Sequence, residues 1–144
     1  MTQPKPQTIA AWTSLVTANR VLLSDIEAAL KNAGMPSLGW YDALLEIEKA
    51  GAAGIRPFDL KERLLLPQYG MSRLLKRMKK EELIDRLEVE EDGRGQIISL
   101  TLKGRSLRQR MWPVYANSLI KSVERHLSES EAEELSRLLK MLVS

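Results

Sequence analysis

The sequence contains no cysteine, a single histidine and a single phenylalanine, and it has no long apolar run. Without cysteine there is no disulfide framework, no thiolate metal site and no sulfur-based peroxide sensor. No apolar stretch approaches the roughly 20 residues that span a bilayer, so we expect no membrane partner. The first residues, MTQPKPQTIA, lack the apolar core of a signal peptide. We therefore expect a cytoplasmic protein.

What the chain does contain is an ordinary globular composition with one unusually basic segment. Its 144 residues are 44% apolar and 28% charged, enough for one compact domain or a small domain with added helices. The net charge is only +3, but cations without any acid gather between residues 71 and 80: Arg73, Lys76, Arg77, Lys79 and Lys80. The basic character is therefore local.

The spacing of apolar residues predicts a mainly α-helical fold with one small β-hairpin. We expect helices over residues 8–32, 40–50 and 57–64, a fourth from Pro67, a fifth over 102–126 and a last one after Ser128. Thr101 should cap the fifth helix and Pro113 should kink it, while Ser128 and Glu131 form a capping-box pattern. The first helix carries an apolar stripe wider than one neighbouring helix covers, which favours a partner chain.

A tight helical corner, a basic helix and a hairpin follow one another in the order of a winged helix-turn-helix. A helix fits the DNA major groove, where base edges present distinctive donors and acceptors. The fourth helix would read bases and phosphates, and the hairpin tip would bring an arginine to the adjacent minor groove. The candidate DNA-binding residues are Gln68, Tyr69, Ser72 and Arg73 toward bases, Lys76 and Arg77 toward phosphates, and Arg94 at the tip.

The stretch LPQYGMSRLLKRMKKEELIDRLEVEEDGRGQIISLTLKG resembles the recognition helix and wing of the multiple antibiotic resistance regulator (MarR) family. Members typically carry Asp-x-Arg followed by Leu-Thr-x-x-Gly in the wing, and these positions here are Asp92, Arg94, Leu100, Thr101 and Gly104. By this resemblance, Arg94 is the minor-groove arginine and Asp92 is the acid that steadies it.

The resemblance also implies the organisation and activity of the whole chain. Residues 1–36 would form an N-terminal dimerisation helix, 37–103 the DNA-binding lobe and 104–144 the C-terminal dimerisation helices. Members of the family are obligate homodimers that repress or activate transcription at pseudo-palindromic operators, and small anionic or phenolic ligands often modulate them. We expect a transcriptional regulator of this kind, acting as a repressor, with a small-molecule effector as a further expectation.

Three positions depart from the family pattern. Glu82 stands where a glycine usually precedes the first wing strand, and Leu65 stands where the helical corner commonly has glycine. Leu66 occupies a position where Ser, Thr or Asp usually caps the fourth helix, so that helix should begin less firmly. None of the three removes the basic surface.

Other interpretations of the same residues remain open. The Asp-Gly and Arg-Gly pairs can be simple turn chemistry, and a winged helix can bind protein instead of DNA, here through its acidic first strand. Trp12, Trp40 and Trp112 could line an effector pocket, although core or dimer packing also explains them. An enzyme is disfavoured because His126 has no evident catalytic partner. We assign no metal and no cofactor.

Overall fold

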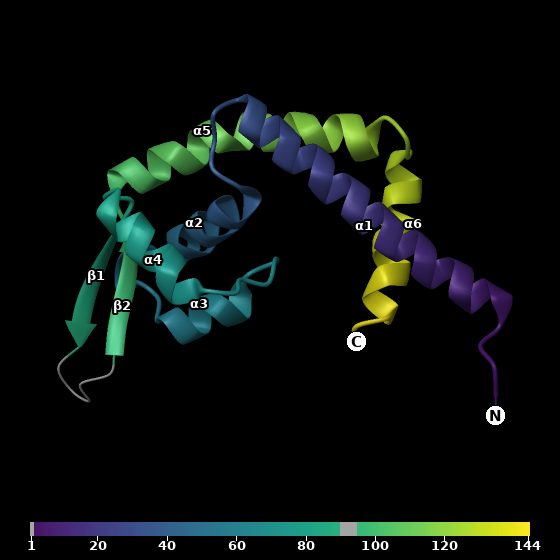
Figure 1. Cartoon of the computed structure of the whole chain (residues 1–144), viewed down its shortest axis with the longest axis horizontal. Coiled ribbons are helices and arrows are strands. Elements are labelled where there is room, and N and C mark those ends of the chain that lie inside the picture. Colours follow the sequence, from purple (N-terminus) through teal and green to yellow (C-terminus); the bar gives the residue numbers. More distant parts are fainter. Residues whose placement is uncertain (1, 90–94) are drawn as a thin grey trace. The chain divides into compact units, whose positions relative to one another are not determined.

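The computed structural model describes residues 2–89 and 95–144, and its contacts divide the chain into two units. One unit comprises Met1–Ala33 and Val114–Ser144, and the other comprises Gly34–Pro113. Figure 1 shows helices α1 to α6 and a two-stranded antiparallel hairpin, which confirms the predicted fold class. Among the described residues, none of the helices is both long and apolar enough to cross a membrane.

The unit of Gly34–Pro113 contains the helical corner and the hairpin. Its elements in chain order are α2 (Leu38–Ala50), the short 3-10 helix η1 (Gly51–Ala53), α3 (Pro57–Arg63), α4 (Met71–Lys80), β1 (Ile84–Val89), β2 (Gly95–Leu100) and the first part of α5 (Leu102–Leu119). Gly51 ends α2 with a φ of 68°, a backbone conformation that favours glycine. The predicted boundaries of the second and third helices are thus correct to within a few residues.

The core of this unit lies between the helices and one face of the hairpin. Fully buried side chains come from every layer: Leu44, Ile47, Leu60, Leu75, Met78, Ile84 and Ile98. The strands pair from Ile84 opposite Leu100 to Val89 opposite Gly95. Ile55 forms an antiparallel bridge to Ile98 on the other edge of β2.

The other unit consists of α1 (Pro6–Asn32), the end of α5, a π-helical turn η2 (Ile120–Glu124) and α6 (Glu129–Met141). Pro6 lies in the first turn of α1, where its missing N–H costs no helical hydrogen bond. The Ser128 hydroxyl accepts from the Glu131 N–H at 3.1 Å, and the Glu131 carboxylate accepts from the Ser128 N–H at 2.9 Å. The capping box is therefore confirmed.

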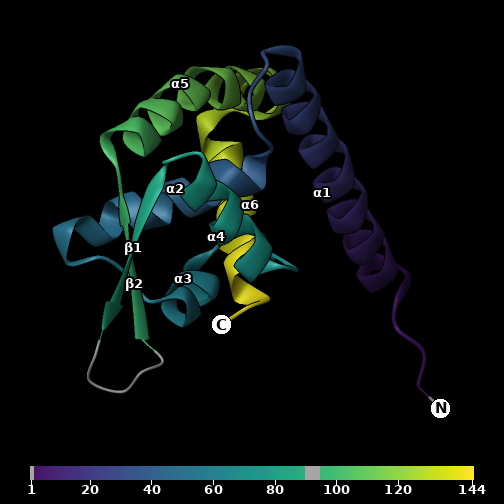
Figure 2. The same ribbon diagram turned by 60° about the vertical axis from the view of Figure 1, so that its left-hand side comes forward.

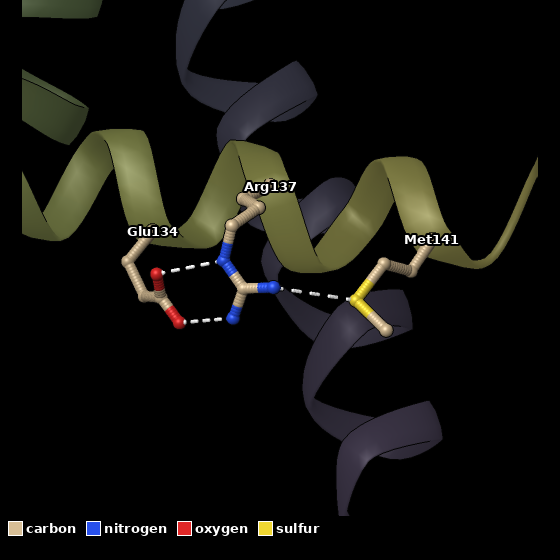
Figure 3. A network of polar contacts seen from close by, with 3 residues as sticks. All are labelled: Glu134, Arg137 and Met141. Carbon is tan, nitrogen blue, oxygen red and sulfur yellow. Dashed lines mark hydrogen bonds and ion pairs between the residues drawn. The ribbon is translucent and has the colours of Figure 1, made fainter.

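Arg137 forms hydrogen bonds with two other side chains of α6. Its guanidinium donates to both carboxylate oxygens of Glu134, at 3.0 and 2.6 Å, and to the Met141 sulfur at 3.5 Å (Figure 3). All three side chains are exposed, so the contacts support this helix locally rather than a core.

The prediction of one continuous fifth helix to His126 was wrong. The α-helix passes Pro113 without interruption but ends at Leu119, and a π-helical turn follows, in which the Arg125 N–H donates to the Ile120 carbonyl. The hydrogen bonds there span five residues instead of four. Apolar spacing over so short a stretch does not separate these two patterns.

Candidate nucleic-acid interface

Helix α4 separates an apolar face from a basic one. Leu74, Leu75 and Met78 are buried, as their spacing predicts, and Met71 at the start of the stripe is half-buried. The remaining side chains are exposed: Ser72, Arg73, Lys76, Arg77, Lys79 and Lys80. The helix therefore presents cations to solvent from a surface whose opposite side is fixed in the core.

The start of α4 differs from the prediction. The helix begins at Met71 and not at Pro67, because Gly70 adopts a left-handed φ of 86° and serves as the N-cap. Gln68 and Tyr69 consequently lie before the helix and not in its first turns. Tyr69 is 96% exposed.

Gln68 points toward the start of α2. A Cβ added to Gly39 would lie 2.1 Å from the Gln68 Nε2 atom, so the amide occupies space that only glycine leaves free. Of the four residues predicted to face bases, the structure therefore places Ser72 and Arg73 on the exposed helix, Tyr69 on the preceding loop and Gln68 against α2.

A buried carboxylate anchors the corner between α3 and α4. Asp42 on α2 is 8% exposed, and its Oδ2 atom accepts a hydrogen bond from the Leu66 N–H at 2.8 Å. The backbone at Leu66 is thus held by a side chain distant in sequence instead of by a local cap. Sequence reasoning missed Asp42; its signal was an acid between the apolar residues Tyr41 and Ala43 in the first half of α2.

Arg77 is positioned by an aromatic ring. Its guanidinium carbon lies 5.4 Å from the centroid of Trp40, within the range of a cation–π contact. Trp40 is half-buried, so it is neither free surface nor full core. The contact fixes where the charge of Arg77 is presented at the exposed face of α4.

The end of α4 passes into β1 through a Schellman motif. The Leu83 N–H donates to the Met78 carbonyl at 2.9 Å and the Glu82 N–H donates to the Lys79 carbonyl at 3.0 Å. Glu82 adopts a φ of 62°, and it is the one residue other than glycine with positive φ in the described part of the chain. Glycine is usual at this position in the family, and the left-handed conformation explains why. Glu82 adopts the same conformation although it has a side chain.

The Leu-Thr-x-x-Gly sequence joins the hairpin to α5. The Thr101 hydroxyl accepts from the Gly104 N–H at 3.0 Å and donates to the Glu82 carbonyl at 2.7 Å, which confirms Thr101 as the cap of α5. A Cβ on Gly104 would lie 2.2 Å from the Leu83 carbonyl oxygen. The threonine and the glycine therefore hold the base of the hairpin directly against the start of α5.

The hairpin is braced by a cross-strand hydrogen bond near its middle. Arg86, which lies opposite Ile98, donates to the side-chain oxygen of Gln96, which lies opposite Glu88. The predicted contact residues Asp92 and Arg94 lie in the segment 90–94, outside the described residues. Their assigned roles stay predictions.

An ion-pair cluster connects α2 to the first part of α5. Glu48 lies 2.9 Å from the Arg108 Nε atom and 3.5 Å from the Arg105 Nε atom. Desolvation tends to lower the pKa of Arg108, but hydrogen bonds to Glu48 and Tyr41 raise it above its ordinary value. Tyr41 also stacks on Trp112, with ring centroids 6.1 Å apart. These contacts brace the lobe on the side of α2.

A helical corner, an exposed basic helix and a hairpin braced against the next helix together define a winged helix-turn-helix domain. Residues 33–95 match the model of the MarR family. This part of the chain is therefore similar to the winged-helix domain of the MarR family, which confirms the resemblance found in the sequence.

Solved structures share the fold over nearly the whole chain. AbsC, a MarR family transcriptional regulator from Streptomyces coelicolor, is 22% identical with a TM-score of 0.84, covering 99% of this chain and 96% of that one. Sco3205, from the same organism and solved in complex with DNA, is 20% identical with a TM-score of 0.85 over 99% and 89%. A mutant MarR from E. coli, complexed with operator DNA, is 21% identical with a TM-score of 0.80 over 99% and 100%. A comparison with curated proteins gave no match.

Proposed function

We propose that this protein is a DNA-binding transcriptional regulator that reads a pseudo-palindromic operator as a homodimer. The single observation that supports this best is α4, whose apolar face is buried while a side free of acids exposes Ser72, Arg73 and Lys76. A helix docked in this way can enter the major groove without losing core contacts. Two of the similar structures, Sco3205 and the E. coli MarR mutant, contain DNA.

Within this proposal the residues have different roles. Ser72 and Arg73 contact base edges, Lys76 contacts phosphate, and Arg77 contacts phosphate from its position over Trp40. Tyr69, exposed on the loop before α4, contacts the DNA backbone next to these residues. Arg94 at the wing tip reaches the minor groove with Asp92 beside it, as the family resemblance implies.

The dimer is supported by the burial pattern of the unit that contains α1 and α6. Among its described residues only Ile26, Leu30 and Ser118 are buried, although α1 alone is 27 residues long. Large apolar side chains on both helices remain exposed: Ile9, Trp12, Val16, Leu135, Leu138 and Met141. Trp12 is 64% exposed, so the alternative that it packs in the core of a single chain was wrong. A second copy would cover these surfaces.

A two-fold dimer places its two recognition helices about 34 Å apart, one turn of DNA. Repression is the proposed mode of action, in the cytoplasm, by binding and not by catalysis. A small-molecule effector would act by binding one dimer geometry better than the other, since a ligand shifts an equilibrium only through such a difference.

The test is fluorescence anisotropy with DNA from upstream of the gene, against scrambled DNA of equal length, at two salt concentrations. We expect a clear preference for the native sequence and a steep salt dependence. Arg73→Ala should reduce that preference, whereas Lys76→Ala should weaken binding to both DNAs and lower the salt slope by about 1. Lys103→Ala, an exposed cation on α5, is the matched control and should change neither.

Two results would contradict parts of the proposal. Equal binding of native and scrambled DNA by the unmodified protein would argue against a specific regulator and favour a protein-binding winged helix. Unchanged operator affinity in Arg94→Ala, with the dimer intact, would remove the role assigned to the wing tip.

A further inference from the structure

A pocket of about 460 Å³ lies on the side of the winged-helix unit formed by the end of α2, the link into α3, α3 itself and β2. Figures 1 and 2 both show α3 beside the hairpin. The side chains that matter for its chemistry are Lys49, Ile55, Arg56, Asp59, Arg63 and Ile97. None of the residues to which we assign DNA contacts lines it. All its lining residues belong to the one unit Gly34–Pro113.

The wall of this pocket formed by the link into α3 is held against β2 by backbone contacts. The Ile55 N–H donates to the Ile98 carbonyl at 2.9 Å, and the Ile98 N–H donates back to the Ile55 carbonyl at 2.8 Å. Gly54 has a φ of 76°, and a Cβ there would lie 2.3 Å from the Ile97 side chain. The segment before Arg56 is therefore fixed against β2 by the hydrogen bonds of Ile55 and by the close packing of Gly54.

The charge at the pocket is predominantly positive and largely unpaired. Lys49 is paired with Glu46 at 3.1 Å. Within the described residues, Arg56 and Arg63 have no ion pair or side-chain hydrogen bond, and Asp59 is the one carboxylate in the lining. Two guanidinium groups therefore face an open pocket with their donors available.

The pocket also offers apolar surface beside these charges. Ile55 is 5% exposed and Ile97 is half-buried, and both contribute to the lining. Guanidinium groups bind carboxylate and phosphate through parallel N–H donors, and apolar walls accept the rest of a small organic anion. The volume is within the range of small-molecule sites.

We propose that this pocket binds an anionic group, a carboxylate or a phosphate, through Arg56 and Arg63. The group belongs either to a free small anion or to a phosphate of bound DNA. The free-anion source is independent of the proposed function, whereas the DNA source rests on it. The two sources are distinguished by the experiments below.

The first experiment titrates the full-length protein, labelled with nitrogen-15, with inorganic phosphate and separately with benzoate at constant ionic strength. We expect saturable shifts of the backbone amides of Gly54, Arg56 and Asp59. The double variant Arg56→Gln, Arg63→Gln should bind about tenfold more weakly or worse, as expected for the loss of a charge-assisted hydrogen bond.

Three further variants make this result interpretable. Lys103→Gln with Arg110→Gln removes the same net charge from exposed positions on α5 outside the lining, and should leave anion binding unchanged. Arg56→Lys with Arg63→Lys keeps the charge but loses the planar fork, and should recover binding only in part. Spectra with otherwise unchanged amide positions show that each variant is folded.

The second experiment measures DNA affinity of the same variants against salt. If the anionic group is a DNA phosphate, Arg56→Gln with Arg63→Gln lowers the salt slope by about 1 to 2 for every DNA sequence, and the control pair does not. If it is a free anion, the double variant binds DNA with unchanged affinity in the absence of added anion, while phosphate or benzoate binds the unmodified protein and not the double variant.

The proposal is overturned if neither anion gives saturable shifts and the double variant has the same salt slope as the unmodified protein. It is also overturned if anion binding persists unchanged in Arg56→Gln, Arg63→Gln. A protein that failed to bind DNA at all would contradict the proposed function and remove the DNA source, and the anion titration alone would then decide.

Discussion

At the scale of single residues, the connection between α4 and β1 requires a left-handed backbone conformation at Glu82, and the side chain of Glu82 does nothing to stabilise it. Glu82 has a φ of 62° at the position after the helix cap where the left-handed conformation is required. Its exposed side chain has no role in the hydrogen bonds that close the turn, which come from the backbone. The strain should therefore be removable without loss of contacts.

We expect Glu82→Gly to raise the free energy of unfolding by about 0.5 to 1 kcal/mol. The left-handed conformation costs a residue with a Cβ about 1 to 2 kcal/mol, and the greater freedom of glycine in the unfolded chain offsets part of the gain. Urea unfolding at one fixed protein concentration measures the change. Glu81→Gly is the control: Glu81 has a φ of −85°, so glycine there should only destabilise. Equal effects of the two substitutions would contradict this explanation.

Gly104 is required for a different reason, because the backbone of Leu83 occupies the space next to it. A methyl group there would lie 2.2 Å from the Leu83 carbonyl oxygen and 2.7 Å from the Leu100 Cδ1 atom. Gly104→Ala should lower the free energy of unfolding by about 1 to 3 kcal/mol, as overpacking does. Thermal unfolding followed by circular dichroism measures this loss. Lys103→Ala, at the adjacent exposed position, should have little effect. A similar loss there would show that the start of α5 is sensitive to substitution in general, and that crowding at Gly104 is not the cause.

At the scale of elements, predictions from the sequence succeeded where periodicity determines the answer. The buried stripe of α4 follows from apolar residues three and four apart, and the hairpin follows from alternation on either side of Asp92 to Gly95. The capping box at Ser128 was predicted because its two partners are three residues apart. Each of these is a local pattern.

Predictions failed where distant contacts or backbone conformation decide. Pro67 was a reasonable helix start, but Gly70 takes the left-handed conformation and Leu66 is held by Asp42, 24 residues away in the chain. The orientation of Gln68 depends on space beside Gly39, which no local pattern reveals. About half of the candidate interface, the exposed cations of α4, could thus be predicted from the sequence. The conformation of residues 66–70, which lead into α4, could not.

The start of α6 should depend on pH. The Ser128 N–H and hydroxyl lower the pKa of Glu131 below its ordinary value of 4.5. A lowered pKa in the folded state contributes stability that is present above pH 4.5 and is lost as the pH falls through the lower value. We expect carbon-13 shifts of residues 129–133 to lose helical character between about pH 5 and pH 3.

The matched variant for this prediction is Glu131→Gln, whose amide oxygen still accepts from the Ser128 N–H but does not titrate. It should show a weaker helical signal at pH 6 and less change on acidification. Glu134, whose pKa is lowered by Arg137, remains in both proteins and gives the residual pH dependence farther along α6. An identical pH response in the variant would show that Glu131 is not the responsible group.

At the scale of the whole molecule, the two units differ in how well the chain covers its own apolar surface. The winged-helix unit buries side chains from all of its main elements, whereas the unit of α1 and α6 has only Ile26, Leu30 and Ser118 buried among its described residues. A long helix gains most of its stability from packing of its apolar face, so leaving that face exposed to water is unfavourable for an isolated chain. We therefore expect the stability of this unit to depend on the formation of a dimer.

We expect sedimentation equilibrium to give a mass of twice 16.3 kDa, and Leu138→Glu to shift it toward one chain. Leu138 is 46% exposed in the single chain, and a carboxylate there would be buried without a partner when a second copy covers it. Ser136→Glu places the same charge at an exposed polar position of α6 and should leave the dimer intact.

Because the winged-helix unit has its own core, Leu138→Glu should keep the amide pattern of residues 38–89. Operator affinity should fall, since each chain then contacts one half-site. A dimer of unchanged stability in Leu138→Glu would mean that the second copy covers another surface.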